Sequence, residues 1–447
     1  MDPAKLARLA KKTDLGALLD RLDAMSEEDL DKLVGPGRSG GDGASGRAPR
    51  AEKPYAPPAP DDDFYGLFER QLTDEQQRVR SVVRRFMVEE VAPVINPYWE
   101  RGEMPFELVP GLRDALHEAL GPNPAERYCT DGFLAGLVSL EIPRVDPSVG
   151  TFLGVHWGLC LYSIWRFGSD AQKERWVGPL ERFEKVGSWA LTEPEHGSDA
   201  ALGLETTATR EGDTWTLNGA KKWSGNATFA DVTVVWARDT ADGHVKGFLV
   251  EKGAPGFVVE KLEGKIAKRA VQNVDIRLEN VEVAEADRLP GVRTFKDVAG
   301  QLATARAGVS WEACGMAMGI YEATLDYCTR RRQFGKPIAG FQLVQEGLVR
   351  MLGNVVAIQA TILGLGQLYQ EHERLHERAS LAKVWCVDKM RETASIGRGL
   401  LGGNGILLEH HVARLFADAE AVYSYEGSRE MNVLITGRAI TGLSAFV

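Results

Sequence analysis

The sequence predicts an α+β fold in which a helical region, a β region and a second helical region follow one another. Helical spacing of apolar residues, broken at several prolines, continues to about residue 184. Between about residues 187 and 289 the period changes to two, as in half-buried strands, and from residue 295 it is helical again. The last region suits an antiparallel four-helix bundle.

Two segments precede the first helical region. Residues 1–34 carry leucines at helical spacing and a capping pattern at Ser26, and so predict a helical extension. Residues 35–63 are rich in Gly, Pro, Ser and charges that cannot bury a core, so we expect a disordered linker. The predicted domains are then a helical domain at 64–186, a barrel-like β domain at 187–294 and the C-terminal bundle at 295–447.

The composition is that of a soluble globular protein. Of the 447 residues, 44% are hydrophobic and 26% are charged. A formal net charge of -10 argues against nucleic acid or an anionic membrane surface as a partner, because both attract excess Lys and Arg. The five cysteines form no CxxC pair, and the N-terminus has no apolar segment of the signal-peptide kind. We therefore expect a cytoplasmic location, no membrane contact and no metal site.

Individual elements can be placed within the last two regions. A Thr-rich run around Glu211-Gly212-Asp213 predicts a hairpin, and Asn218-Gly219 predicts a second turn. Further strands are expected at 232–236, 247–251, 257–262 and 274–283. Helices of the bundle are expected near 302–333, 342–372, 378–400 and 409–419.

Two loops lie where helices give way to strands. In Trp-Ala-Leu-Thr-Glu-Pro-Glu-His-Gly-Ser-Asp at 189–199, a proline and a glycine enforce an irregular backbone that exposes N–H groups and hydroxyls to a cofactor. Asn-Gly-Ala-Lys-Lys-Trp at 218–223 places a large aromatic side chain after the predicted turn. Each loop alone is equally compatible with a boundary turn or with core packing. Together they resemble the flavin-binding signature of the acyl-CoA dehydrogenase family.

Three further motifs follow in the order and spacing of that family, and the resemblance covers roughly residues 64–447. The stretch 330–338 with Gln342 resembles the family's Arg-x-x-Phe-Gly element, although it could also end a helix whose dipole favours arginines. Residues 402–405 resemble its Gly-Gly-Asn-Gly turn. Tyr-Glu-Gly-Ser at 425–428 resembles its Tyr-Glu-Gly-Thr base motif, with Ser428 in place of Thr.

The resemblance implies the fold of that family and FAD as the cofactor. Thr192 and the backbone near Leu191 would bind the isoalloxazine ring, and Trp223 would pack against it. Arg331 and Gln342 would contact the FAD of a neighbouring subunit, which implies a homotetramer, a dimer of dimers, with FAD at the subunit interface. The implied cofactor-binding residues are Trp189, Leu191, Thr192, Ser198, Trp223, Gly225, Arg331, Phe334, Gln342, Gly402, Gly403 and Ser428, and the implied substrate-binding residues are Ser198, Arg306 and Gly427.

The resemblance further implies an enzyme that dehydrogenates an acyl-CoA thioester to a trans-2-enoyl-CoA. Glu426 would take a proton from the α-carbon while the β-carbon delivers a hydride to the flavin. The N–H of Glu426 and a flavin hydroxyl would hold the thioester oxygen. Some members carry the base one residue before the arginine that matches Arg306. Here that residue is Ala305, which leaves Glu426 as the base.

Within the family, the likeness is to short-chain acyl-CoA oxidases of plant peroxisomes and then to glutaryl-CoA dehydrogenases. Residues 124–132 depart from a Tyr-Gly-Gly-type loop that shapes the acyl pocket, so acyl length and branching stay open. Gly150 stands where an arginine grips the distal carboxylate in glutaryl-CoA dehydrogenases, which disfavours a dicarboxylic acyl group.

Three alternatives remain open at this point. The electron acceptor is either an electron-transfer flavoprotein or oxygen. The acyl group rides either on CoA or on a carrier protein that docks on residues 1–34. The third alternative is a flavin-retaining protein without catalysis, which the intact Glu426 disfavours.

Overall fold

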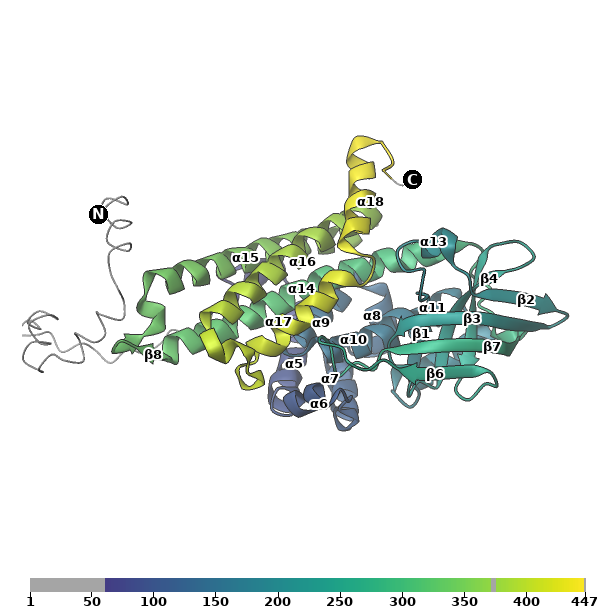
Figure 1. The fold of residues 1–447 in the computed structure, drawn as a ribbon, viewed down its shortest axis with the longest axis horizontal. Coiled ribbons are helices and arrows are strands. Elements are labelled where there is room, and N and C mark those ends of the chain that lie inside the picture. The colour runs from purple at the N-terminus through teal and green to yellow at the C-terminus, as the bar shows by residue number, and fades with distance from the viewer. Residues whose placement is uncertain (1–60, 371–374, 446–447) are drawn as a thin grey trace, which may run out of the picture. The chain divides into compact units, whose positions relative to one another are not determined.

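The computed structural model of the protein describes residues 61–370 and 375–445. A helical region, a β region and a second helical region follow one another in these residues, which confirms the predicted fold class (Figure 1). The expected helical extension at 1–34, and residues 35–60 of the expected linker, lie outside the described residues.

The first region supplies one wall of the functional site. It begins at the predicted cap, where the Thr73 hydroxyl accepts the N–H of Gln76 and the Gln76 side chain accepts the N–H of Thr73. The cavity wall itself is α9 (Gly132–Val145) and a continuous run of α10 (Pro147–Leu153), the π-helical segment η3 (Gly154–Leu161) and α11 (Tyr162–Phe167). The other helical segments are α4 (Leu67–Gln71), α5 (Asp74–Phe86), η1 (Met87–Val91), α6 (Ile95–Arg101), α7 (Val109–Leu120), α8 (Pro124–Thr130) and α12 (Asp170–Glu181).

The β region is a single seven-stranded sheet with strand order β1-β4-β2-β3-β7-β6, and β5 pairs with β4. Its inner face has an apolar core of its own, which includes Trp215 and Phe248. A short helix, α13 (Ala200–Gly203), connects β1 to β2. The strands are β1 (Gly187–Ala190), β2 (Thr207–Glu211), β3 (Thr214–Ser224), β4 (Val232–Asp239), β5 (Val245–Glu251), β6 (Phe257–Lys261) and β7 (Val274–Ala284).

One predicted turn is wrong. The hairpin around Gly212 joins β2 to β3 as expected, but Asn218 and Gly219 lie inside β3. The register with β7 shifts between Leu217 and Gly219, and Gly219 has a φ of 147°. A Cβ at Gly219 would lie 2.6 Å from the Thr206 hydroxyl. This Asn-Gly pair therefore forms a β-bulge that bends the strand and does not reverse the chain.

The last region is a helical bundle with one additional helix. In Figure 1, α14 (Phe295–Arg330), α15 (Gln342–Gln370), α16 (Leu375–Leu400) and α17 (Val412–Ser424) run alongside one another, and α18 (Arg429–Thr441) projects from them. A two-stranded ribbon of β8 (Arg332–Gln333) and β9 (Lys336–Pro337) joins α14 to α15. The first helix begins at Phe295, earlier than expected, because Thr294 and Asp297 form a capping box there.

The helix α15 is also long and apolar enough to cross a bilayer. The most apolar 18-residue stretch of its Gln342–Tyr369 segment has a mean hydropathy of 1.6, and 39% of that stretch is buried. It packs against α14 and α16, as a core helix of a bundle does.

Two glycines let α9 and α14 cross at very short range. A Cβ added at Gly315 would lie 1.9 Å from the carbonyl oxygen of Leu140, and one at Gly319 would lie 2.1 Å from that of Arg144. No side chain can occupy either position without moving a backbone. This crossing fixes how the cavity faces of the two helices meet.

Candidate active site

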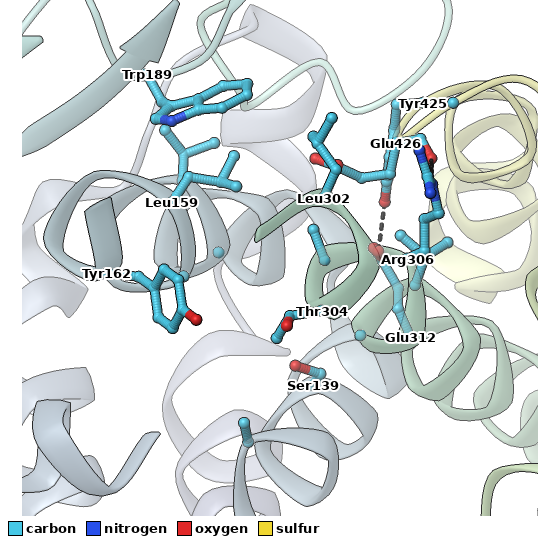
Figure 2. A pocket seen from close by; sticks show the side chains of 18 of the residues that line it. Ser139, Leu159, Tyr162, Trp189, Leu302, Thr304, Arg306, Glu312, Tyr425 and Glu426 are labelled. Atoms are coloured by element: carbon cyan, nitrogen blue, oxygen red, sulfur yellow. Dashed lines mark hydrogen bonds between the residues drawn. The ribbon is translucent and has the colours of Figure 1, made fainter. Parts of the chain in front are cut away.

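A cavity of about 1280 Å³ lies between the first helical region, the start of the sheet and the bundle. Figure 2 shows Tyr425, Glu426, Arg306 and Glu312 together on one side of it, with Trp189, Leu159 and Tyr162 on the other. The cavity brings together nine residues that the sequence suggested, namely Trp189, Leu191, Thr192, Ser198, Trp223, Gly225, Arg306, Glu426 and Gly427.

The remaining suggested residues lie outside this cavity. Phe334 is 92% exposed in the ribbon between α14 and α15, beside the exposed Arg331 and Gln342. Gly402 and Gly403 are exposed after α16, and a Cβ on either would meet no atom within 4 Å. Ser428 caps α18, since its hydroxyl accepts the N–H of Met431 at 3.2 Å.

Glu426 sits in a tight turn between α17 and α18. Its φ is 54°, in the left-handed region that non-glycine residues rarely adopt, and Gly427 follows with a φ of 82°. Such a conformation persists only where the surroundings hold it. The part of Glu426 that remains accessible faces the cavity.

Three side chains hold the carbonyls of this turn. The ammonium of Lys383, which is fully buried on α16, donates to the carbonyl oxygens of Tyr425 and Gly427. Arg306 Nε, on α14, donates to the carbonyl of Glu426 at 3.4 Å. Asn432 Nδ2 donates to the carbonyl of Gly427 at 2.9 Å. Each backbone oxygen from 425 to 427 therefore has a donor.

A second network holds the side chain of Tyr425. Its hydroxyl donates to Glu312 on α14, the bond drawn in Figure 2. The ammonium of Lys268 lies 2.6 Å from Glu312 Oε1, 2.6 Å from Thr151 Oγ1 and 2.5 Å from the Tyr425 hydroxyl. Lys268 has a φ of 44° in the loop before β7. The network therefore joins all three regions beneath the turn.

Burial and the charges around Glu426 shift its pKa in opposite directions. Burial raises the pKa of Glu426 above its usual value, and the negative charge of Glu312 adds to this. The positive charges of Lys383 and Arg306 lower it, but they do not cancel the rise. Burial also lowers the pKa of Lys383 to about 8. Glu426 is thus a carboxylate made more basic by its enclosure and kept ionisable by two cations.

On the opposite side, a rigid loop brings Leu191 and Thr192 to the cavity. The Glu193 carboxylate accepts the N–H groups of Glu205 at 2.7 Å and Thr206 at 2.9 Å, and it pairs with buried Lys221 at 2.8 Å. The carbonyl of Thr192 accepts the N–H of Lys222 at 2.8 Å. These bonds fasten the loop after β1 to the end of β3.

The end of β3 completes this side. Trp223 has a φ of 66° and is 53% exposed, so its indole lies at the cavity edge and not in a core. The Ser224 hydroxyl is buried in the lining and has no hydrogen-bond partner among the described residues. Such a group is costly to leave unpaired, and in the cavity lining it is available to a bound polar group.

The inner end of the cavity combines apolar walls with hydroxyl groups. The segment 124–132, which departs from the family pattern, forms helix α8 and the start of α9, and Tyr128 of α8 brings its hydroxyl to Ser139 of α9. Ala305 lines the cavity next to Arg306, so no second carboxylate occupies the alternative base position. Gly150 also lines it, and a Cβ there would lie 2.9 Å from Pro143.

Sequence reasoning missed Lys383, Lys268 and Glu312. A signal existed for Lys383, because it occupies one helical stripe with the buried Ala379, Cys386 and Met390. A lysine in an apolar stripe marks a buried charge that needs partners inside the fold. No comparable pattern surrounds Lys268, whose partners come from sequence positions as distant as Thr151 and Tyr425.

Comparison with known proteins decides the family. Models of the acyl-CoA dehydrogenase N-terminal, middle and C-terminal domains match residues 73–184, 188–281 and 295–441. An acyl-CoA dehydrogenase of Bacillus subtilis is 31% identical over 380 residues, which are 83% of this chain and 99% of that protein. This chain belongs to the acyl-CoA dehydrogenase family.

Solved structures agree with this assignment. A glutaryl-CoA dehydrogenase from Mycobacterium smegmatis matches with a TM-score of 0.81 and 35% identity, over 86% of this chain and 99% of that one. A glutaryl-CoA dehydrogenase from the same organism, solved in complex with FADH2, matches with a TM-score of 0.81 and 32% identity, over 85% and 97% of the two chains. A structure reported in work on the electron transferring flavoprotein of Acidaminococcus fermentans matches with a TM-score of 0.77 and 29% identity, over 83% and 98%.

The cavity residues fit a flavin. A half-exposed indole at the rim, an unpaired buried hydroxyl at Ser224 and a fixed loop at Thr192 supply a flat apolar face and polar atoms for a heterocycle. Gly225 has no side chain to occupy the cavity, and a Cβ there would lie only 3.1 Å from Val155.

Proposed function

We propose that this chain is an FAD-dependent acyl-CoA dehydrogenase in which Glu426 removes the proton from the α-carbon of the thioester. The observation that carries the proposal is the enclosure of Glu426 in a held, left-handed turn, across the cavity from the Thr192 and Trp223 loops. The named activities of the matched relatives support the reaction class.

The chain's own groups contribute the proton transfer and its stabilisation. The pKa of Glu426 is raised by burial, so its carboxylate is a stronger base than an exposed glutamate. Its backbone N–H has no acceptor among the described residues and is therefore free to hold the thioester oxygen as enolate charge develops. FAD, when bound, accepts the β-hydrogen with its electron pair, so the acyl-CoA leaves as a trans-2-enoyl-CoA.

A dicarboxylic acyl group is disfavoured at the inner end of the cavity. Gly150 lines the cavity and offers no side chain to bind a distal carboxylate. A neutral acyl group needs no such partner. The proposed substrates are thus monocarboxylic acyl-CoAs.

An electron-transfer flavoprotein is the proposed acceptor of the electrons. The relatives are named dehydrogenases, and one matched structure comes from work on such a flavoprotein. Peroxide release in air during turnover tests this point, since a strict dehydrogenase forms almost none and an oxidase forms one equivalent for each enoyl product.

A homotetramer is the proposed assembly. The residues matching the family's intersubunit FAD contacts lie outside the cavity of this chain, next to exposed apolar side chains. The exposed apolar side chains are Phe334, Leu343, Ile406 and Leu407. A second copy of the chain bound there would cover these apolar side chains, and Arg331 would then contact the FAD of that second copy. Light scattering of the FAD-loaded protein measures the assembly directly.

The function is tested with purified, FAD-loaded protein under anaerobic conditions. Acyl-CoAs of increasing length, a branched one and glutaryl-CoA are added, and loss of the oxidised flavin absorbance is followed. Bleaching by at least one monocarboxylic acyl-CoA, faster than by glutaryl-CoA, is the expected result. If none of them bleaches the flavin, the proposed function is wrong.

A further inference from the structure

Lys383 is a lysine buried in the middle of a helix bundle. Its side chain is fully enclosed on the face of α16 that also buries Ala379 and Val387. A charge in such a place is retained only where other groups compensate it.

The compensation comes from the turn that carries Glu426. The ammonium donates to the carbonyls of Tyr425 and Gly427, the two neighbours of Glu426 in the chain. Among the described residues Lys383 forms no direct ion pair, so its bonds are to neutral backbone oxygens and its charge acts on Glu426 through space. A solely structural tie could be made by a neutral donor.

We infer that Lys383 is a positioning residue for proton abstraction: it clamps the left-handed turn that presents Glu426 to the cavity, and its charge keeps that carboxylate ionised. The inference rests on the proposed role of Glu426 as the base. It assigns to Lys383, which does not line the cavity, an influence on the chemical step.

Several charged groups face this pair, from each helix packed against it. Glu426 is surrounded by Lys383 from α16, and by Arg306 and Glu312 from α14. Lys383 is also influenced by Glu430 of α18. Arg306 Nη1 lies 3.3 Å from His376 Nδ1 at the start of α16, and burial together with Arg306 lowers the pKa of that histidine.

Lys383 makes more hydrogen bonds to the turn than Arg306 does. Arg306 makes one bond, at 3.4 Å, to the Glu426 carbonyl, whereas Lys383 spans two carbonyls. Both cations lower the pKa of Glu426 against the rise caused by burial and Glu312. Removal of the Lys383 charge therefore moves the pKa of Glu426 further upward.

The test uses FAD-loaded protein, butyryl-CoA as the probe and anaerobic stopped-flow bleaching over a pH range of about 5.5 to 9. Lys383→Gln keeps a donor but removes the charge, and Lys383→Arg keeps the charge. Lys389→Gln is the matched control on the same helix, because Lys389 pairs with Glu392 at 2.8 Å, away from the cavity. Flavin content and circular dichroism establish folding first.

In Lys383→Gln we expect the midpoint of the pH–rate profile to move up by about one unit, which slows the acidic limb about tenfold while the rate recovers at high pH. Lys383→Arg and Lys389→Gln should keep the wild-type midpoint. A uniform slowing of Lys383→Gln at every pH would reduce Lys383 to a structural role and overturn the inference, and so would an unchanged profile.

Two outcomes separate this inference from the proposed function. If Glu426→Gln is inactive but Lys383→Gln keeps the wild-type midpoint, only the role of Lys383 fails. If Glu426→Gln bleaches normally, the proposed function fails with it. Should Lys383→Gln not retain flavin, Lys383→Arg decides, because a shifted midpoint in a variant that keeps the charge contradicts the inference.

Discussion

The Tyr425 hydroxyl donates a hydrogen bond to the Glu312 carboxylate, so the residue before Glu426 is tied to the middle of α14. Lys268 contacts both groups from the loop before β7. The turn is consequently held twice, through its carbonyls by Lys383 and through the Tyr425 side chain by this network.

Removal of the Tyr425 hydroxyl should loosen the turn without removing the base. Tyr425→Phe leaves Glu312 and Lys268 each short of one hydrogen bond, which costs about 1–3 kcal/mol of unfolding free energy. We expect a lower denaturation midpoint and slower bleaching with retained FAD. Tyr423→Phe, two residues earlier at the end of α17, serves as the control and should change neither. Equal stability of Tyr425→Phe and wild type would show that the network is not formed.

The Lys268–Glu312 pair should show strong coupling. Either Lys268→Met or Glu312→Gln leaves a buried charge unpaired, which costs about 3–5 kcal/mol. The double variant should cost clearly less than the sum, as measured by urea unfolding in a double-mutant cycle. The exposed pair of Arg101 and Glu103, 2.8 Å apart, is the matched comparison and should couple by no more than about 1 kcal/mol. Additive effects at Lys268 and Glu312 would contradict the pairing.

Asp418 should make stability fall as pH rises. Burial raises its pKa to about 7, with Asp146 adding to the rise. The folded state then holds a proton that the unfolded state releases near pH 4, so stability is lost between about pH 4 and 7, on the order of a few kcal/mol.

Asp418→Asn isolates this contribution. The variant keeps an acceptor for Trp99 Nε1 and the N–H of Lys268, but it cannot titrate. Buried His156 and His411, with pKa values lowered by burial to about 4 and about 3, favour stability as pH rises and remain in both proteins. The stability difference between variant and wild type should therefore grow with pH, and a constant difference would refute the titration of Asp418.

Close packing of α9 on α14 should tolerate no side chain at Gly315. In Gly315→Ala the new Cβ would lie 1.9 Å from the carbonyl oxygen of Leu140, so the helices must separate and the cavity must deform. Loss of FAD and a markedly lower melting temperature are expected. Gly300→Ala on the same helix has open space around the new Cβ and should be neutral or stabilising by about 0.5–1 kcal/mol. Similar melting of both variants would rule out this close contact.

Much of the fold follows from local pattern. The switch of apolar period, the caps at Thr73 and the hairpin at Gly212 each depend on neighbouring residues, and the structure bears them out. The turn predicted at Asn218-Gly219 was wrong because the dipeptide that forms hairpin turns also forms β-bulges. Only the pairing of β3 with β7, distant in sequence, decides between the two.

The site was predictable where its residues belong to contiguous motifs. Thr192, Trp223 and Glu426 each stand in such a motif, and the fold brings them to one cavity. Lys268 and Glu312 carry no local signal, because a buried ion pair is defined by two partners that only tertiary structure unites. Lys383 was recognisable as a charge in an apolar stripe, but its carbonyl partners were not.

The removal of the α-proton by Glu426 is tested most directly by anaerobic bleaching of FAD-loaded Glu426→Gln with butyryl-CoA. The control is Glu174→Gln, an exposed glutamate on α12 that does not line the cavity. Wild type and Glu174→Gln should bleach alike, and Glu426→Gln should bind FAD but bleach at least about 100-fold more slowly, since it lacks the general base. Bleaching of Glu426→Gln at the wild-type rate would contradict the account.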